Sequence, residues 1–264
     1  MHPIERLRYV ARASGAPHAL LVRETAAALG SFGSDPSGLI TACRRIVARQ
    51  PTSGPVWWLA ARVLTAPDPL PEAWAAVEEM EQDRTARELA YALFDDATVC
   101  VLGWPDTIAE ALVRRGDVEV LVVDSLGEGS GLVHRLLAAD LDALDVPAIG
   151  LGAAAADADL VLLEASAIGQ DSFLGVTGSR AAAATARHAG VPVWLVGGVG
   201  RLLPVRMWDA MVARVETEDP WDADDEIVPL DLVDRVVGPD GPEPVADALL
   251  RTDCPVAPEL FKQL

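Results

Sequence analysis

The spacing of apolar residues along the chain changes near residue 95. Before that point, apolar residues recur every three to four positions, which is the pattern of amphipathic helices. Separate stripes run through residues 19–29, 39–47 and 57–64, and a longer one runs from Pro71 to Phe94 with Trp74 facing inward. Gly30 fits a helix end, and Ser34-Asp35-Pro36 fits a helix start with a capping residue before proline. Residues 1–94 are therefore predicted to form a helical N-terminal domain.

After residue 95, short apolar runs alternate with helical patterns. Strands are predicted at residues 98–102, 118–123, 148–151, 160–163 and 191–196, with helices at 106–115, 130–143 and 178–189. Continuous apolar strands separated by helices indicate a parallel sheet covered on both faces. We therefore expect an α/β protein in which residues 95–264 form a Rossmann-like domain with a mostly parallel sheet. Ligands of such sheets bind outside the carboxyl ends of the strands.

Charge narrows the range of partners. The 264 residues include 40 acids against 21 bases, a formal net charge of −19, and Lys262 is the only lysine. Such a charge repels nucleic-acid phosphates and anionic lipid, so we expect neither direct nucleic-acid binding nor membrane binding. The acid excess favours a salt-rich cytoplasm, where screening makes self-repulsion tolerable; a high-GC genome is the alternative reason for the near-absence of lysine. Segment 216–247, with twelve acids against Arg235 alone, is expected to be a solvated surface excursion.

The cysteines and histidines offer no metal site. Cys43, Cys100 and Cys254 are scattered, with no second cysteine or histidine at ligand spacing, so structural zinc and a disulfide framework are not expected. The chain has no apolar run of 18 residues and no signal-like N-terminus. We therefore predict a cytoplasmic protein without a metal or other cofactor.

The residues themselves suggest little chemistry. The Gly-rich loop 126–131 departs from the dinucleotide-binding spacing, so it predicts such a cofactor only weakly. Gly197 and Gly198 follow the last predicted strand and fit either a ligand loop or a turn. Asp124, at another strand end, could hold a ligand hydroxyl or cap the next loop. Cys100 lies in an apolar run, which is more typical of a buried thiol than of a nucleophile, and Trp57-Trp58 favours the core or a domain interface.

Several segments together resemble one family. They are Pro51-Thr52-Ser53-Gly54-Pro55-Val56-Trp57-Trp58, Asp159 to Ile168, Gly178-Ser179, His188 to Val193 and Pro255 to Leu260. This set is similar to the superfamily of initiation factor 2B regulatory subunits (alpha, beta and delta), which includes methylthioribose-1-phosphate isomerase and ribose-1,5-bisphosphate isomerase. The resemblance implies a helical domain, a Rossmann-like domain, and homodimers or larger rings. In the enzymes it implies a catalytic cysteine and aspartate, with Arg, Asn and Lys side chains that hold the sugar phosphate.

This chain departs from the family pattern at the positions that carry the chemistry. The catalytic cysteine falls on Gly103 and the catalytic aspartate on Ser166, whose hydroxyl cannot act as the base. The nearest substitute carboxylate is Asp171. The expected Asn-Lys pair falls on Gly175 and Val176, and three expected arginines fall on Ser14, on Gln50 beside Arg49, and on Leu126.

The sequence therefore predicts a non-catalytic regulatory subunit that acts through dimer and partner surfaces, with weak sugar-phosphate or nucleotide binding. Its protein partner would belong to translation or nucleotide metabolism. The alternative is an aldose–ketose isomerase with displaced catalytic residues drawn from Cys100, Asp124 and Asp171; a dinucleotide-dependent enzyme is a third reading. Candidate ligand-binding residues are Ser14, Gly15, Arg49, Asp124, Ser166, Asp171, Gly178, Ser179, Gly197 and Gly198, with Arg180 and Arg201 as further anchors for an anion.

Overall fold

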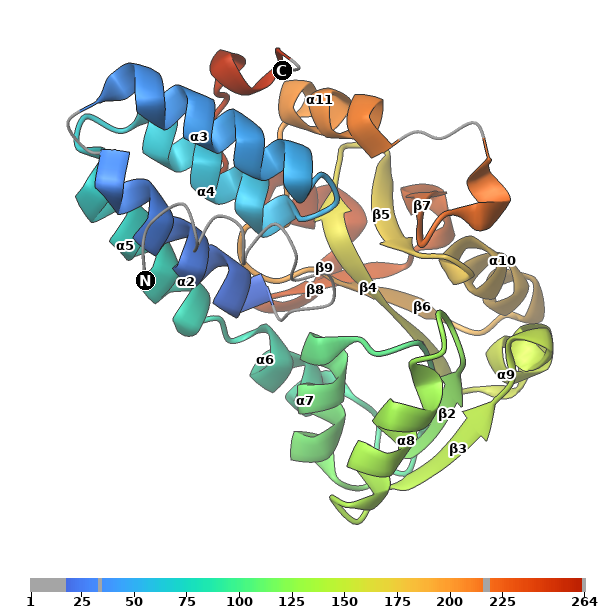
Figure 1. Ribbon diagram of the computed structural model, residues 1–264. Coiled ribbons are helices and arrows are strands. Elements are labelled where there is room, and N and C mark those ends of the chain that lie inside the picture. Colours follow the sequence, from blue (N-terminus) through green and yellow to red (C-terminus); the bar gives the residue numbers. More distant parts are fainter. Residues whose placement is uncertain (1–17, 33–34, 216–218, 263–264) are drawn as a thin grey trace.

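The N-terminal part of the chain folds into a layer of helices. The computed structural model describes residues 18–32, 35–215 and 219–262. The layer consists of α2 (His18–Leu29), α3 (Pro36–Arg49), α4 (Gly54–Thr65) and α5 (Pro69–Glu81), which stack together beside the sheet (Figure 1). The predicted helix start at Pro36 is confirmed, because the Asp35 carboxylate accepts a hydrogen bond from the Gly38 amide at 3.0 Å.

The prediction of one helix from Pro71 to Phe94 is wrong. The chain breaks at Gln82–Arg84 and starts α6 (Thr85–Ala92), because Asp83 accepts hydrogen bonds from the Thr85 amide at 2.8 Å and hydroxyl at 2.6 Å. This local capping competes with continuation of the helix. Trp74, expected inward, is 45% exposed. Helix α6 packs on the sheet rather than on α2–α5, and the domain division at residue 94 remains a prediction.

The C-terminal part is a mostly parallel sheet with helices on both faces, so the predicted α/β fold class is confirmed. The strands run in the order β3-β2-β1-β4-β6-β8-β9, and β9 is the antiparallel member of this series. Their bounds are β1 (Thr98–Leu102), β2 (Glu119–Val123), β3 (Asp142–Val146), β4 (Leu160–Ile168), β6 (Val193–Val196), β8 (Arg235–Gly238) and β9 (Gly241–Pro244). Strand β4 continues past its parallel part and pairs antiparallel with β5 (Ser172–Val176), which pairs with β7 (Asp225–Pro229).

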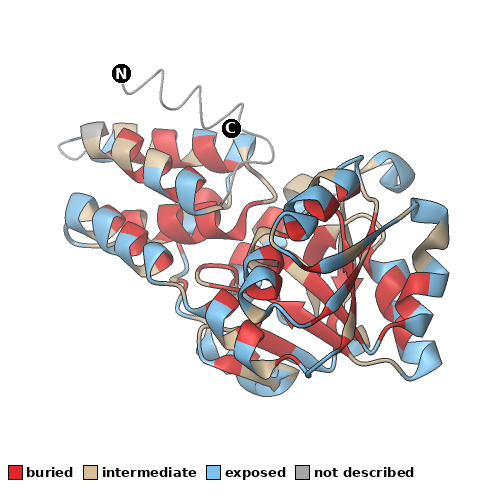
Figure 2. Cartoon of the chain, turned by 90° about the horizontal axis from the view of Figure 1, so that it is seen from below, coloured by how far each residue is buried: buried red, intermediate tan, exposed pale blue. Residues whose placement is uncertain are grey.

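The faces of the sheet carry separate apolar clusters. Helices α6, α7 (Asp106–Arg115) and α8 (Gly129–Leu137) cover one face, and α9 (Leu151–Asp157) and α10 (Ser179–Ala189) cover the other. A third cluster joins α2–α5 to α11 (Val205–Val215) and the C-terminal segment. Figure 2 shows buried residues both in the helical layer and along the strands of the sheet. Trp57 and Trp58 have no exposed surface, which confirms their predicted core position. Helix α12 (Val245–Ala248) follows β9, and single 3-10 turns cover Gly30–Phe32, Ala148–Gly150, Pro220–Asp222, Leu230–Leu232, Leu249–Arg251 and Pro258–Leu260.

Two sequence assignments in this part are wrong. The predicted strand 148–151 is a 3-10 turn leading into α9, and the third strand is instead β3, which falls partly inside the predicted helix 130–143. Strand β3 lies at the sheet edge, so Asp142 and Asp145 point to solvent and interrupt the apolar run that would reveal it. Alanine-rich 151–157 favours a helix.

The acidic segment 216–247 is not a surface excursion over the part that the structure describes. Residues 225–229, 235–238 and 241–244 are the strands β7, β8 and β9. Some of its acids connect it to distant parts of the chain: the Asp234 carboxylate accepts a hydrogen bond from the Val193 amide at 2.8 Å, and the Glu226 carboxylate accepts one from the Gly178 amide at 2.8 Å. The acid content of the segment therefore does not show that it is solvated, because carboxylates such as these accept hydrogen bonds from the backbone.

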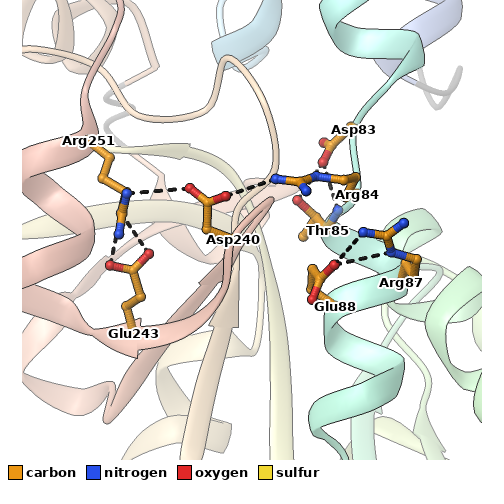
Figure 3. Close-up of polar contacts among 8 residues, drawn as sticks. All are labelled: Asp83, Arg84, Thr85, Arg87, Glu88, Asp240, Glu243 and Arg251. Atoms are coloured by element: carbon orange, nitrogen blue, oxygen red, sulfur yellow. Dashed lines mark hydrogen bonds and ion pairs between the residues drawn. The ribbon is translucent and has the colours of Figure 1, made fainter.

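Asp83 and Arg84 connect the helical layer with the sheet. The Asp83 carboxylate accepts a hydrogen bond from the Val199 amide at 2.9 Å, and a Cβ at Gly198 would lie 2.2 Å from its Oδ2 atom. Beside it, Arg84 pairs with Asp240 at 2.9 Å (Figure 3). Arg251 continues this chain of exposed ion pairs to Asp240 at 3.4 Å and to Glu243 at 2.7 Å.

Within the described residues, no helix is long and apolar enough to cross a membrane. The same residues contain no group of three or more His, Cys, Asp or Glu side chains placed to hold a metal ion.

Candidate functional site

A cavity of about 1130 Å³, called the crevice below, lies between the helical layer and the carboxyl ends of β1 and β4. This is where the strand order of the sheet reverses direction, the usual ligand position in such folds. The crevice is lined from the helical layer by His18, Leu21 and residues 49–53, and from the sheet side by Leu102, residues 104–106, Leu126, Glu128, Arg135, residues 162–166, Val176, Ser179, Arg201, Asp224 and Asp225.

A buried ion pair forms part of the crevice wall. The Arg201 Nη2 atom lies 2.7 Å from Glu164 Oε1, and the two side chains are only 6% and 11% exposed. Arg201 also donates to the Ala165 carbonyl at 2.5 Å and to the Thr107 hydroxyl at 3.2 Å. Burial alone would raise the pKa of Glu164, but the Arg201 charge and the hydrogen bonds that Glu164 accepts lower it on balance. Glu164 is therefore an ionised carboxylate that already has its partners.

Carboxylates of the chain itself occupy three helix N-termini around the crevice. Glu164 caps α7, Glu226 caps α10 and Asp124 caps α8. The donors are the backbone amides of Thr107 (2.9 Å), Ile108 (3.2 Å), Gly178 (2.8 Å), Arg180 (2.9 Å) and Gly129 (3.0 Å). Free amides at a helix N-terminus are the usual seat of a phosphate. Here those amides already bind an anionic group of the protein.

Other ionisable groups of the crevice have shifted pKa values. Burial raises the pKa of Asp106, and burial together with the charge of Asp224 raises the pKa of Asp225 to about 6. Burial and then the Arg201 charge lower the pKa of His18 to about 4. His18 is therefore neutral at pH 7, with its Nδ1 atom 3.3 Å from the Ser53 hydroxyl.

The structure brings part of the predicted ligand-binding set together. Arg49, Ser166, Ser179 and Arg201 line the crevice, although Arg201 is held by Glu164. Ser179 donates its hydroxyl hydrogen to the Val176 carbonyl at 2.6 Å, so it acts at the α10 N-terminus. Ser14 and Gly15 lie outside the described residues.

The other predicted residues do not line the crevice. Asp124 caps the loop before α8, which was the alternative left open for it. Gly178 is the α10 N-cap, where its amide binds Glu226. Gly197 and Gly198 directly precede the turn at Val199-Gly200, and the close approach at Gly198 is that of the Asp83 carboxylate. Asp171 is exposed on the hairpin between β4 and β5, where it accepts a hydrogen bond from Ser172 at 2.8 Å.

The positions expected to supply a nucleophile are unsuited to it. Gly103 has a φ of +60°, which disfavours a residue with a side chain, so a cysteine there would be strained. Cys100 is fully buried in β1, and burial raises its pKa to about 12. Arg180 points elsewhere, because its guanidinium donates to the Ile227 carbonyl. Cys100, Asp124 and Asp171 therefore do not meet at one point of the crevice.

Sequence reasoning missed several residues of the crevice wall, including His18, Trp104, Asp106, Glu164 and Asp225. Glu164 carried a usable signal: a carboxylate inside an otherwise apolar strand is buried only when it is paired. The partner, Arg201, lies 37 residues further along the chain, and only the fold brings the two together.

Comparisons with known proteins agree on the fold. No protein-family model and no curated protein sequence matches this chain. Among solved structures, translation initiation factor eIF-2B from Pyrococcus horikoshii OT3 superposes with a TM-score of 0.78 at 13% identity, covering 94% of this chain and 98% of that one. The structure of eIF2B beta from Chaetomium thermophilum superposes with a TM-score of 0.73 at 18% identity, covering 99% of this chain and 93% of that one. A chain of the tetrameric eIF2B-beta2-delta2 complex from C. thermophilum superposes with a TM-score of 0.76 at 19% identity, covering 94% of this chain and 92% of that one. This chain therefore has the fold of the eIF2B subunits.

Proposed function

We propose that this chain is a non-catalytic member of the eIF2B regulatory-subunit family, and that it acts through surfaces for a second copy of itself and for a protein partner. The fold supports membership, since it is shared with eIF2B subunits over nearly the whole chain. One of these relatives is described as a tetrameric beta2-delta2 complex, which supports assembly as the mode of action.

The observation that carries the non-catalytic part is the Glu164–Arg201 pair on the N-terminus of α7. An isomerase of sugar phosphates needs an acid and a base beside the sugar, and cationic or amide donors for the phosphate. In this crevice the buried guanidinium and the helix amides are bound to Glu164, and Ser166 stands at the expected position of the base.

The test of activity is phosphorus NMR of ribose 1,5-bisphosphate with an excess of purified protein in molar KCl, followed for a day. We expect the substrate signals to stay unchanged. Conversion to the ribulose ester, absent from a heat-inactivated control, would contradict the proposal and would favour the isomerase with displaced residues.

The test of assembly is light scattering in the same buffer, which suits a cytoplasmic protein with a net charge of −19 adapted to salt. We expect the mass of a dimer or a larger multiple. A monomer mass over the whole accessible concentration range would contradict action through a dimer surface.

A further inference from the structure

We propose that the crevice binds a small organic cation, an amine or guanidinium compound that carries no phosphate, through Asp106 and Asp225. The inference deepens the proposed function by naming the ligand class of the crevice. It rests on that proposal only in taking the crevice to be free of a sugar-phosphate substrate.

The first support is the balance of charges in the crevice wall. Five carboxylates line it, those of Asp106, Glu128, Glu164, Asp224 and Asp225, against three guanidinium groups, those of Arg49, Arg135 and Arg201. Glu164 and Arg201 neutralise each other at 2.7 Å, and His18 is uncharged at pH 7. Four carboxylates and two guanidinium groups are left to meet a ligand, so the site favours positive charge.

The second support is that Asp106 and Asp225 are withdrawn from solvent without being directly paired with a cation of the chain. Both are half-buried, and neither makes an ion pair within 4.0 Å with a described residue. The hydrogen-bonding side chains beside them are neutral, Trp104 for Asp106 and Thr52 for Asp225. The charges of Arg135 and Arg201 act on Asp106 without pairing with it, and burial together with the Glu164 charge outweighs them, so the pKa of Asp106 stays raised. A half-buried carboxylate without a directly paired cation is unfavourable, and a bound ammonium or guanidinium group would offset that cost.

The third support is an apolar and aromatic surface next to these carboxylates. Leu102, Leu126 and Trp104 line the crevice, and the Trp104 indole is fixed against α8, because a Cβ at Gly131 would lie 2.6 Å from its Cζ3 atom. The Arg135 guanidinium carbon lies 6.0 Å from the centre of the ring system, so this indole already has a cation nearby. The methylene groups of an organic amine would pack on this surface while its charged ends meet the carboxylates.

The same wall disfavours an anion. The amides at the N-termini of α7 and α10 bind Glu164 and Glu226, and Arg201 has its carboxylate partner. A phosphate would have to displace one of these carboxylates or rely on Arg49 and Arg135, which are exposed at the crevice. An amine requires no such displacement.

The experiment is isothermal titration calorimetry of the whole chain with agmatine, which carries one guanidinium and one ammonium group. Molar KCl shortens the screening length to about 3 Å, which suppresses diffuse binding of cations to the acidic surface but affects half-buried contacts less. We expect binding of one agmatine per chain. Asp106→Asn and Asp225→Asn should each weaken it by roughly tenfold, since each removes a charge-assisted hydrogen bond.

The matched control is Asp231→Asn, which removes the same charge from an exposed position outside the crevice and should leave the affinity unchanged. Both crevice variants remove a half-buried charge, so we expect them to unfold no more easily than the wild type, and a thermal melt of each checks this. The proposal is overturned if agmatine gives no binding heat, if Asp231→Asn weakens binding as much as the crevice variants, or if ribose 5-phosphate binds more tightly than agmatine. Absence of agmatine binding would leave the non-catalytic proposal intact, whereas turnover of ribose 1,5-bisphosphate would contradict that proposal whatever agmatine does.

Discussion

Arg201 and Glu164 form a buried ion pair, 2.7 Å between Nη2 and Oε1, that joins the middle of β4 to the segment after β6 and caps α7. The Glu164 carboxylate binds both the Arg201 guanidinium and two backbone amides of α7, at the point where the strand order reverses. A crevice with the shape of a ligand site thus has its anion-binding groups bound to a carboxylate of the chain itself.

The first prediction concerns that pair. Arg201→Met leaves Glu164 as an unpaired buried charge, so we expect a loss of about 3–5 kcal/mol in the free energy of unfolding. The double variant Glu164→Leu/Arg201→Met removes both charges and should recover a large part of the loss. Urea denaturation of the wild type, both single variants and the double variant measures the coupling. Additive single effects would show that the two residues do not depend on each other.

The second prediction concerns pH. The pKa of Asp225 in the folded chain, about 6, lies above its ordinary value of 3.8, so ionisation of this carboxylate disfavours the folded state. The cost is absent well below pH 3.8, grows between there and about pH 6, and is complete above that range. Asp225→Asn should therefore be more stable than the wild type by about 1–2 kcal/mol near pH 8, with the difference shrinking as the pH falls toward 4. A difference that does not change with pH would argue against the raised pKa.

The third prediction separates the two connections between the helical layer and the sheet. Asp83→Ala leaves the amides of Thr85 and Val199 without their acceptor, so we expect a loss of about 2 kcal/mol in the free energy of unfolding. Asp240→Ala removes only exposed ion pairs to Arg84 and Arg251, and should cost less than about 1 kcal/mol, with the effect vanishing in high salt. Equal effects of the two substitutions would contradict this distinction.

The fourth prediction concerns the thiols. Cys43, Cys100 and Cys254 are all buried, and burial raises each pKa to about 12. A colorimetric disulfide reagent at neutral pH should therefore label none of them in the folded protein within minutes, and all three in denaturant. Rapid labelling of Cys100 in the native protein would contradict this prediction and would make Cys100 a candidate nucleophile again.

The sequence predicted those parts of the molecule in which pattern and packing agree. Helix α7 and strand β1 lie where they were predicted, because α7 buries a regular stripe and β1 buries a continuous apolar run. Strand β3 and the strands after residue 224 were not predicted. Acidic residues at the sheet edge or next to backbone amides interrupt the apolar pattern by which a strand is recognised. Periodicity carries no information about such pairings.

The candidate site was predictable only in outline. The position of the crevice followed from the parallel sheet, and Arg49, Ser166 and Ser179 line it. The contacts that decide its chemistry join residues far apart in sequence, such as Glu226 with Gly178 and Glu164 with Arg201. No local sequence pattern predicts that the Glu226 carboxylate will bind the helix N-terminus at Gly178, 48 residues away.

The most direct test of the central claim, that the chain's own carboxylates occupy the anion-binding groups of the crevice, is a calorimetric titration of the wild-type protein with ribose 1,5-bisphosphate in molar KCl. We expect no saturable binding heat over the concentrations at which the protein stays folded. Saturable binding in the micromolar range would contradict it, and would mean that Arg49, Arg135 or a displaced Glu164 leaves room for a phosphate after all.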